Sequence, residues 1–153
     1  LDLQVQARLP RNEGQHLLEI KSEGAGALTA AHLVGSGYRG DILLSSFKER
    51  EVLDAKRVAP HLPVAGIFDV FSPADIRAYA NMGCRVISLN RKTVTGDLVD
   101  GLHDRGIKVY VWTVDEETEM LQLSAWGVDG IYSNRPALLR SVVSRIEGSS
   151  HGS

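Results

Sequence analysis

Short apolar runs alternate with longer amphipathic segments along most of the chain. The apolar runs predict six strands, over residues 17–21, 42–46, 64–68, 86–89, 109–113 and 130–133. The segments that separate them predict helices over 25–36, 47–59, 74–82, 95–105 and 116–126, with outer helices near 1–10 and 136–146. Because parallel strands need crossover connections, strands that alternate with helices predict a parallel sheet.

Capping residues support these helix boundaries. The run Ser46-Phe47-Lys48-Glu49 has the spacing of a capping box, and Ser72-Pro73 places an N-cap residue before a proline at the first helical position. The acids of Asp115-Glu116-Glu117 suit a helix N-terminus, where the macrodipole favours negative charge. Four glycines lie where a helix is expected to give way to the next strand: Gly37, Gly83, Gly106 and Gly127.

Length and composition indicate one globular domain. With 153 residues, 43% of them hydrophobic, the chain can bury a sizeable core, and no linker interrupts residues 1–146. We therefore expect one domain over 1–146 and a flexible tail over 147–153. The chain starts at Leu1 without an initiator Met or a signal-peptide pattern, which predicts that it begins partway through a longer protein.

Charge and cysteine usage narrow the functional classes. A net charge of -2 and a pI near 6.2 provide no basic footprint for nucleic acid. No apolar run approaches the length of a membrane span, about 18 residues. Cys84 is the only cysteine, so the sequence supports neither an internal disulfide nor a cysteine zinc site. The compartment stays open, with the cytoplasm slightly favoured.

Two parallel architectures compete for this order of elements. A doubly wound fold usually carries a glycine-rich phosphate loop after its first strand, but the loop over 22–26 is acidic and lacks that spacing. A (β/α)8 barrel contains eight such units in about 250 residues, and this chain supplies six. The expected fold class is α/β, a partial TIM-type barrel of six parallel strands whose first two βα units are missing.

The missing units would leave two strands without a neighbour. Parallel strands are normally buried on both faces and rarely tolerate an open edge. We therefore expect possible self-association through the open edges of the strands over 17–21 and 130–133.

The first predicted strand carries two opposite charges. Alternate strand residues face the same side, so Glu19 and Lys21 share a face with Leu17. Both lie at the C-terminal end of the strand, where parallel α/β proteins place their chemistry. The two residues can hold a cation or an anionic group, and an ion pair on an exposed strand edge is the alternative.

Four motifs follow one another along the chain. They are Leu18-Glu19-Ile20-Lys21, Ser45-Ser46-Phe47, Val109-Tyr110-Val111-Trp112-Thr113-Val114, and the run over 127–136 that ends in Ser133-Asn134-Arg135-Pro136. Each motif alone is weak, whereas four in this order and at this spacing are specific. Together they resemble the glycerophosphodiester phosphodiesterase family, from its third barrel strand to its end, over about residues 1–143.

The resemblance implies a reaction and a site. Members of this family are metal-dependent hydrolases of lipid and glycerol metabolism that cut glycerophosphodiesters to glycerol 3-phosphate and an alcohol. By the same resemblance, Glu19 is a ligand of a divalent metal, Mg²⁺ or Ca²⁺, and Lys21 lies near the phosphate. Phe47 and Trp112 line the substrate pocket. A phosphoryl anion beside a hard cation would favour both charged residues at these positions.

The other catalytic motifs of the family have no match here. Its two histidines, in a His-Arg and a His-Asp motif, and its Glu-x-Asp carboxylates are absent before Glu19. The one His-Asp pair, His103-Asp104, falls within a predicted helix. A single carboxylate is a poor site for Mg²⁺ or Ca²⁺, and each missing proton-transfer group costs about 10²–10⁴-fold in rate. No catalytic residue is assigned, and the chain alone is predicted to be an inactive part of an active enzyme.

Other chemically capable residues have simpler explanations. Tyr110 and Trp126 suit core packing, and Ser45 has no base placed to activate it. Four histidines are scattered without metal spacing, which favours structural or surface roles: His16, His32, His61 and His103.

Two alternatives remain for the function. The first is a non-catalytic relative that acts as a binding or interaction module. The second is another phosphate-handling barrel enzyme, which would grip phosphate with the loops after its last two strands. The acidic loop at 115–117 would repel a phosphate, which argues against the second alternative.

Overall fold

The computed structural model describes residues 3–7, 13–38 and 41–150, and the side chains of residues 18–38 and 41–150. Its strands form one sheet, made of β1 (Leu3–Ala7), β2 (Glu13–Glu19), β3 (Ile42–Ser46), β4 (Val64–Phe68), β5 (Val86–Asn90), β6 (Lys108–Trp112) and β7 (Gly130–Ile131). Its α-helices are α1 (Ala25–Gly35), α2 (Glu49–Val58), α3 (Pro73–Asn81), α4 (Gly96–His103), α5 (Glu117–Ala125) and α6 (Pro136–Ser150). Within these ranges, no helix is long and apolar enough to cross a membrane.

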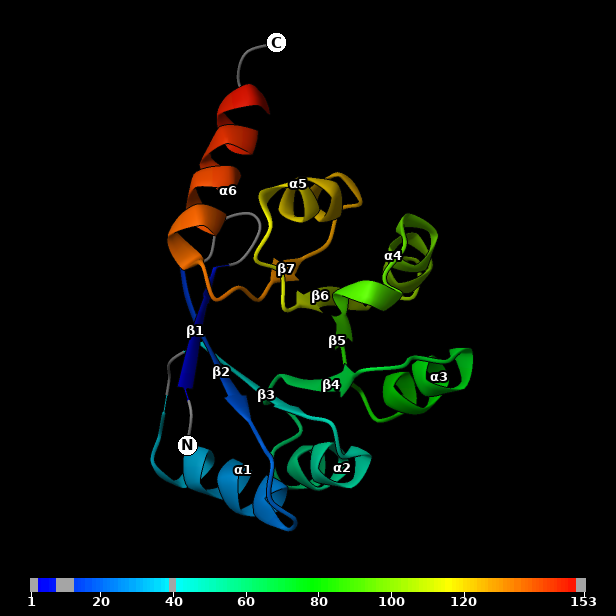
Figure 1. Cartoon of the computed structure of the whole chain (residues 1–153). Coiled ribbons are helices and arrows are strands. Elements are labelled where there is room, and N and C mark those ends of the chain that lie inside the picture. The colour runs from blue at the N-terminus through cyan, green and yellow to red at the C-terminus, as the bar shows by residue number, and fades with distance from the viewer. Residues whose placement is uncertain (1–2, 8–12, 39–40, 151–153) are drawn as a thin grey trace.

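Strands β2 to β7 run parallel and pair in chain order. The sheet curls, and the helices that connect its strands lie around its outer side (Figure 1). This arrangement confirms the predicted partial barrel of six parallel strands with helices.

The N-terminal segment differs from its prediction. Residues 3–7 form β1, which pairs antiparallel with β2, so the helix expected near 1–10 is wrong over these residues. The remainder of that range lies outside the described residues. Apolar Leu3 and Val5 alternate with Gln4 and Gln6, a period of two that suits a strand.

Strand β1 also changes the edge of the sheet. It covers the edge of β2, with Leu3 opposite Leu18, and it lies near β7 and α6. The open edge expected at 17–21 is therefore wrong for the part of the chain that is described. Self-association stays a prediction, but this edge no longer supports it.

The inside of the curled sheet holds an apolar cluster with two tyrosines. Tyr110 and Tyr132 pack edge to face with their ring centroids 5.8 Å apart, and Leu43, Ala65 and Val86 complete the cluster. Tyr110 is 1% exposed, as predicted for a core residue. The interior of the partial barrel is therefore a packed core, as in complete barrels of this type.

The alternate residues of the same strands face outward, against the helices. Ile87, Leu89 and Val109 belong to one outer cluster, against which Trp126 packs as predicted. Leu18 belongs to a second outer cluster beneath the first helices. The strands are therefore apolar on both faces, which is typical of parallel sheets covered by helices.

Most predicted caps are present. Ser72 caps α3, and the Asp75 carboxylate accepts hydrogen bonds from the Ser72 N–H at 2.8 Å and the Ser72 hydroxyl at 2.7 Å. The four glycines expected at helix ends all have φ between 67° and 80°, which favours glycine: Gly37, Gly83, Gly106 and Gly127.

The capping box predicted at Ser46 is wrong. Helix α2 begins later, at Glu49, and Lys48 takes the N-cap position. Ser46 is fully buried in β3, where its hydroxyl donates to the Ile20 carbonyl oxygen at 2.7 Å. Its oxygen also accepts from the Lys48 N–H at 3.1 Å, so the hydroxyl joins the end of β3 both to Ile20 and to the residue before α2.

The ends of β2 and α6 also differ from the prediction. Strand β2 ends at Glu19, so Lys21 lies in the following loop. Helix α6 continues to Ser150 and includes the first residues of the segment expected to be a flexible tail over 147–153. Residues 151–153 lie outside the described residues.

Candidate functional site

The C-terminal ends of β2 to β7 and the loops that follow them form the mouth of the partial barrel. Parallel barrels place their active sites at this end. Glu19 ends β2 and Lys21 follows it, while Phe47 follows β3 and Trp112 ends β6. All four residues predicted for the site therefore lie at the same end of the sheet.

Glu19 and Lys21 differ in exposure. Leu18 and Ile20 pack in the outer core, so the alternation of the strand turns Glu19 toward the inner face, where it is half-buried. Lys21 is exposed, one residue beyond the last bond between β2 and β3, in which the Ile20 N–H donates to the Ser45 carbonyl at 2.7 Å. Among the described residues no ion pair joins Glu19 to Lys21, so the edge ion pair considered as an alternative is not formed.

Phe47 and Trp112 are brought together from distant parts of the chain. Their ring centroids lie 5.6 Å apart at an interplanar angle of 79°, the edge-to-face arrangement that aromatic pairs prefer. Strands β4 and β5 separate their strands in the sheet, so the contact reaches across the inner face. Phe47 is 52% exposed, while Trp112 is half-buried against the interior cluster. The pair offers an apolar wall at the mouth.

A polar pair lies beside this wall. Asn90 ends β5 directly opposite Trp112 in the sheet register. Its side-chain amide donates to Asp69 Oδ1 at 2.6 Å, and its Oδ1 accepts from the Lys92 N–H at 3.0 Å. No motif in the sequence analysis includes Asn90 or Asp69. The mouth therefore combines the apolar wall of Phe47 and Trp112 with the hydrogen-bonded polar pair of Asn90 and Asp69.

Asp115 links the loop after β6 to the loop after β7 by hydrogen bonds. Its Oδ1 accepts from the Asn134 N–H at 2.8 Å and the Ser133 hydroxyl at 3.0 Å, and its Oδ2 accepts from the Asn134 side chain at 3.0 Å. The bonds from the Asn134 side chain and then from its backbone lower the pKa of the Asp115 carboxyl below its ordinary value, against the effect of burial. Helix capping was expected for Asp115, but α5 begins at Glu117 with Glu116 at the N-cap.

The described histidines and the cysteine lie away from the mouth. His103, expected to have a structural or surface role, ends α4, and its Nε2 lies 2.7 Å from Asp129 Oδ2 at the opposite end of the barrel. His32 and His61 are exposed, in the last turn of α1 and before β4. Burial raises the pKa of the Cys84 thiol to about 11, so it stays protonated at neutral pH. None of these side chains offers an acid or base at the mouth.

The carboxylates of the described residues do not complete a metal site. Within the described ranges, no group of three or more His, Cys, Asp or Glu side chains could hold a metal ion. Glu19 supplies one carboxylate, whereas Mg²⁺ and Ca²⁺ take six or more oxygen ligands. The residues present therefore fit a single ligand of such an ion and no more.

The sequence matches known proteins over most of its length. The model of the glycerophosphoryl diester phosphodiesterase family matches residues 12–138. A glycerophosphodiester phosphodiesterase of Caldanaerobacter subterraneus subsp. tengcongensis is 28% identical over 102 residues, which cover 67% of this chain and 42% of the relative. One of Bacillus subtilis is 25% identical over 112 residues, which cover 67% of this chain and 36% of the relative. The chain thus spans less than half the length of these two relatives.

Solved structures share the fold. An Oleispira antarctica phosphodiesterase, in complex with the product sn-glycerol-3-phosphate, has a TM-score of 0.75 at 22% identity, over 83% of this chain and 54% of the other. A glycerophosphodiester phosphodiesterase from Parabacteroides distasonis has a TM-score of 0.75 at 18% identity, over 87% of this chain and 58% of the other. With the family match over residues 12–138, this chain belongs to the glycerophosphoryl diester phosphodiesterase family.

Proposed function

We propose that this chain forms part of the active-site mouth of a divalent-metal-dependent hydrolase that cuts glycerophosphodiesters to sn-glycerol 3-phosphate and an alcohol. The family match over residues 12–138 carries the proposal, because it includes every residue singled out for the site. The shared location of Glu19, Lys21, Phe47 and Trp112 at one end of the sheet supports it.

Each of these residues has a physical role in the proposal. The exposed ammonium group of Lys21 attracts the phosphate as a point charge. The wall of Phe47 and Trp112 packs against the apolar parts of the diester and keeps water from that side. Glu19 contributes one oxygen ligand to Mg²⁺ or Ca²⁺. When bound, such an ion neutralises charge on the phosphoryl oxygens.

We expect the chain as given to bind the product without catalysing hydrolysis. Proton transfer needs an acid and a base at the reacting atoms, each worth about 10²–10⁴-fold in rate. The described histidine side chains lie elsewhere, and His103 is engaged by Asp129. A glycerophosphodiester incubated with the chain and either metal should therefore stay intact, and measurable release of sn-glycerol 3-phosphate would refute this expectation.

The proposed substrate class is tested by titrating the chain with sn-glycerol 3-phosphate, with Mg²⁺, with Ca²⁺ and without metal, while backbone amide resonances are followed by NMR. Lys21→Ala should weaken binding. Lys108→Ala is the matched control, because Lys108 is equally a surface lysine but begins β6 at the opposite end of the barrel.

Three outcomes of this titration are informative. Loss of binding in Lys21→Ala alone supports the proposal. Equal weakening by both variants, or no binding to the unmodified chain, overturns the assignment of the phosphate to the mouth. Binding that neither metal strengthens would favour the non-catalytic binding module over a hydrolase.

A further inference from the structure

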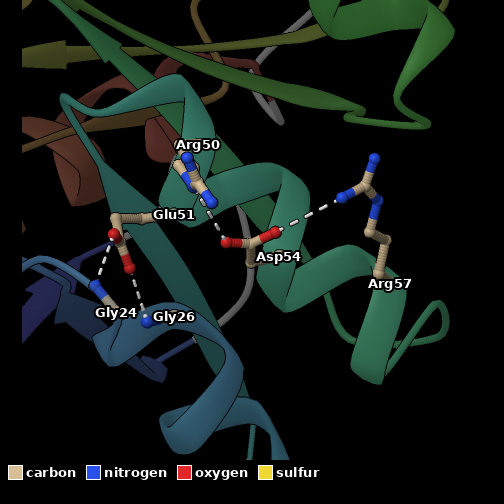
Figure 2. A network of polar contacts seen from close by, with 6 residues as sticks. All are labelled: Gly24, Gly26, Arg50, Glu51, Asp54 and Arg57. Carbon is tan, nitrogen blue, oxygen red and sulfur yellow. Dashed lines mark hydrogen bonds and ion pairs between the residues drawn. The ribbon is translucent and has the colours of Figure 1, made fainter.

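Glu51 lies at the mouth, in the first turn of α2, but no predicted motif includes it. Its side chain is only 1% exposed. One carboxylate oxygen accepts from the Gly24 N–H at 2.8 Å and the other from the Gly26 N–H at 2.7 Å (Figure 2). A single buried side chain of α2 therefore holds the backbone where α1 begins.

The local geometry is built for this contact. Gly24 is the N-cap residue of α1 and has φ +74°, a conformation that favours glycine. At Gly26, a Cβ atom would lie 2.3 Å from the Glu51 carbonyl oxygen and 3.0 Å from Glu51 Oε2. Only glycine lets the two helices approach this closely. The free N–H groups and the positive end of the α1 dipole favour the carboxylate at this point.

Glu51 is committed to these amides and not to a cation. The neighbouring ion pairs of α2 belong to Asp54 (Figure 2). Its Oδ2 lies 3.7 Å from Arg50 Nε, and its Oδ1 lies 3.6 Å from an Arg57 guanidinium nitrogen. The amide bonds lower the pKa of the Glu51 carboxyl below its ordinary value, the bond from Gly26 having the larger effect. The charged form of Glu51 is therefore the form that holds the loop.

The segment that Glu51 anchors contains Lys21. On one side of Lys21, Ile20 is fixed to β3, because its N–H donates to Ser45 and its carbonyl accepts from Ser46. On the other side, Gly24 is fixed to Glu51. The residues between these two anchors are all exposed. The position of Lys21 thus depends on the anchor at each end of this short segment.

The same side chain also ties two mouth loops together. Helix α2 starts two residues after Phe47, so Glu51 joins the loop that follows β3 to the loop that follows β2. We propose that Glu51 is a positioning residue that sets Lys21 relative to Phe47 and thereby the affinity of the mouth for a phosphate group. This inference rests on the function proposed above, in which Lys21 binds the phosphate.

The test compares Glu51→Gln with Asp54→Asn. Each change removes one carboxylate charge from α2, but only Glu51 touches the Gly24–Gly26 backbone. Without ligand, hydrogen exchange of the Gly24 and Gly26 amides and the Lys21 amide resonance are recorded. With ligand, the dissociation constant for sn-glycerol 3-phosphate is measured at a temperature where every variant is folded.

We expect Glu51→Gln to speed exchange at Gly24 and Gly26, to shift the Lys21 resonance, and to weaken binding about three- to tenfold, the equivalent of one amide hydrogen bond. Asp54→Asn should change none of these. A Glu51→Gln protein that is less stable but binds with unchanged affinity would show that Glu51 is merely structural and would overturn the inference. If Glu51→Gln does not fold, Glu51→Asp keeps the charge on a shorter side chain and is held to the same criteria.

Failure of the proposed function looks different. If the unmodified chain does not bind sn-glycerol 3-phosphate, the proposed function is refuted. The positioning role of Glu51 is then tested by the ligand-free measurements alone. An unchanged Lys21 resonance in Glu51→Gln would then refute the positioning role as well.

Discussion

Replacing Gly66 by alanine should destabilise the protein. Gly66 lies in β4, beneath α3, where an added Cβ would approach Tyr79 Cε1 to 2.3 Å, Tyr79 Cδ1 to 2.6 Å and Phe68 Cε2 to 2.9 Å. Carbon atoms in contact normally lie about 3.5–4.0 Å apart. The Tyr79 ring must therefore move by roughly 1 Å, the difference between these distances.

The surroundings make that movement costly. Tyr79 is 3% exposed and packs edge to face on Phe68 with ring centroids 4.9 Å apart, so a shift of one ring disturbs the other. Overpacking of a core costs about 1–3 kcal/mol. Alanine recovers about 0.5–1 kcal/mol through the lower conformational entropy of the unfolded chain. The middle of these two ranges gives an expected net loss of about 1 kcal/mol, which lowers the melting temperature by roughly 2–4 °C for a chain of this size.

Urea unfolding measures this loss, with Gly101→Ala as the control. Gly101 lies inside α4, where the nearest atom to an added Cβ is the end of the flexible Arg105 side chain at 3.7 Å. Alanine there should stabilise the protein by about 0.5–1 kcal/mol. In a Tyr79→Leu background, Gly66→Ala should cost less, because the obstructing ring is gone. Equal unfolding midpoints for Gly66→Ala and the unmodified protein, at equal slope, would refute this reasoning.

Two further predictions concern polar groups. The pKa of Asp115 is lowered in the folded state, so its bonds stabilise the protein above the unfolded carboxyl pKa and are lost as the pH falls below about 4. Thermal unfolding between pH 7 and pH 3 should therefore show a lower melting temperature for Asp115→Asn than for the unmodified protein at pH 7, and this difference should narrow as the pH falls. A difference that stays constant with pH would contradict the prediction. Ser88 Oγ is buried without a hydrogen-bond partner in the described structure, so Ser88→Ala should be neutral or stabilising by up to about 1 kcal/mol in urea unfolding, and a clear loss of stability would contradict the prediction.

The parallel part of the fold was predictable because its signals are local. Apolar runs bounded by turn residues predicted β3 and β4 with the ends that the structure shows, and glycines predicted the helix ends. Strand β1 was missed because its five-residue alternation is short and its partner lies in β2. The Ser46 hydroxyl donates to Ile20, a partner that is known only once the neighbouring strands are placed, so the false capping box could not be recognised from spacing alone.

The candidate site was predictable in location but not in contacts. The motifs placed Glu19, Lys21, Phe47 and Trp112 at strand ends, and parallel pairing brings such ends together. The edge-to-face contact of Phe47 with Trp112 depends on the curvature of the sheet, which no local pattern encodes. The contacts of Glu51 were missed for a related reason, because its partners Gly24 and Gly26 lie at the start of another helix.

Four acidic side chains of the described residues accept hydrogen bonds from backbone amides. Glu51 accepts from Gly24 and Gly26, and three aspartates accept a backbone N–H in the same way: Asp75 from Ser72, Asp115 from Asn134 and Asp129 from Val109. Each of these amide bonds occupies a lone pair that the carboxylate could otherwise offer to a cation. Among the described residues Glu19 makes no such bond, which leaves its oxygens free for a metal. Among the described residues no group of three or more His, Cys, Asp or Glu side chains could hold a metal ion, so an ion bound at Glu19 must complete its coordination with other oxygens.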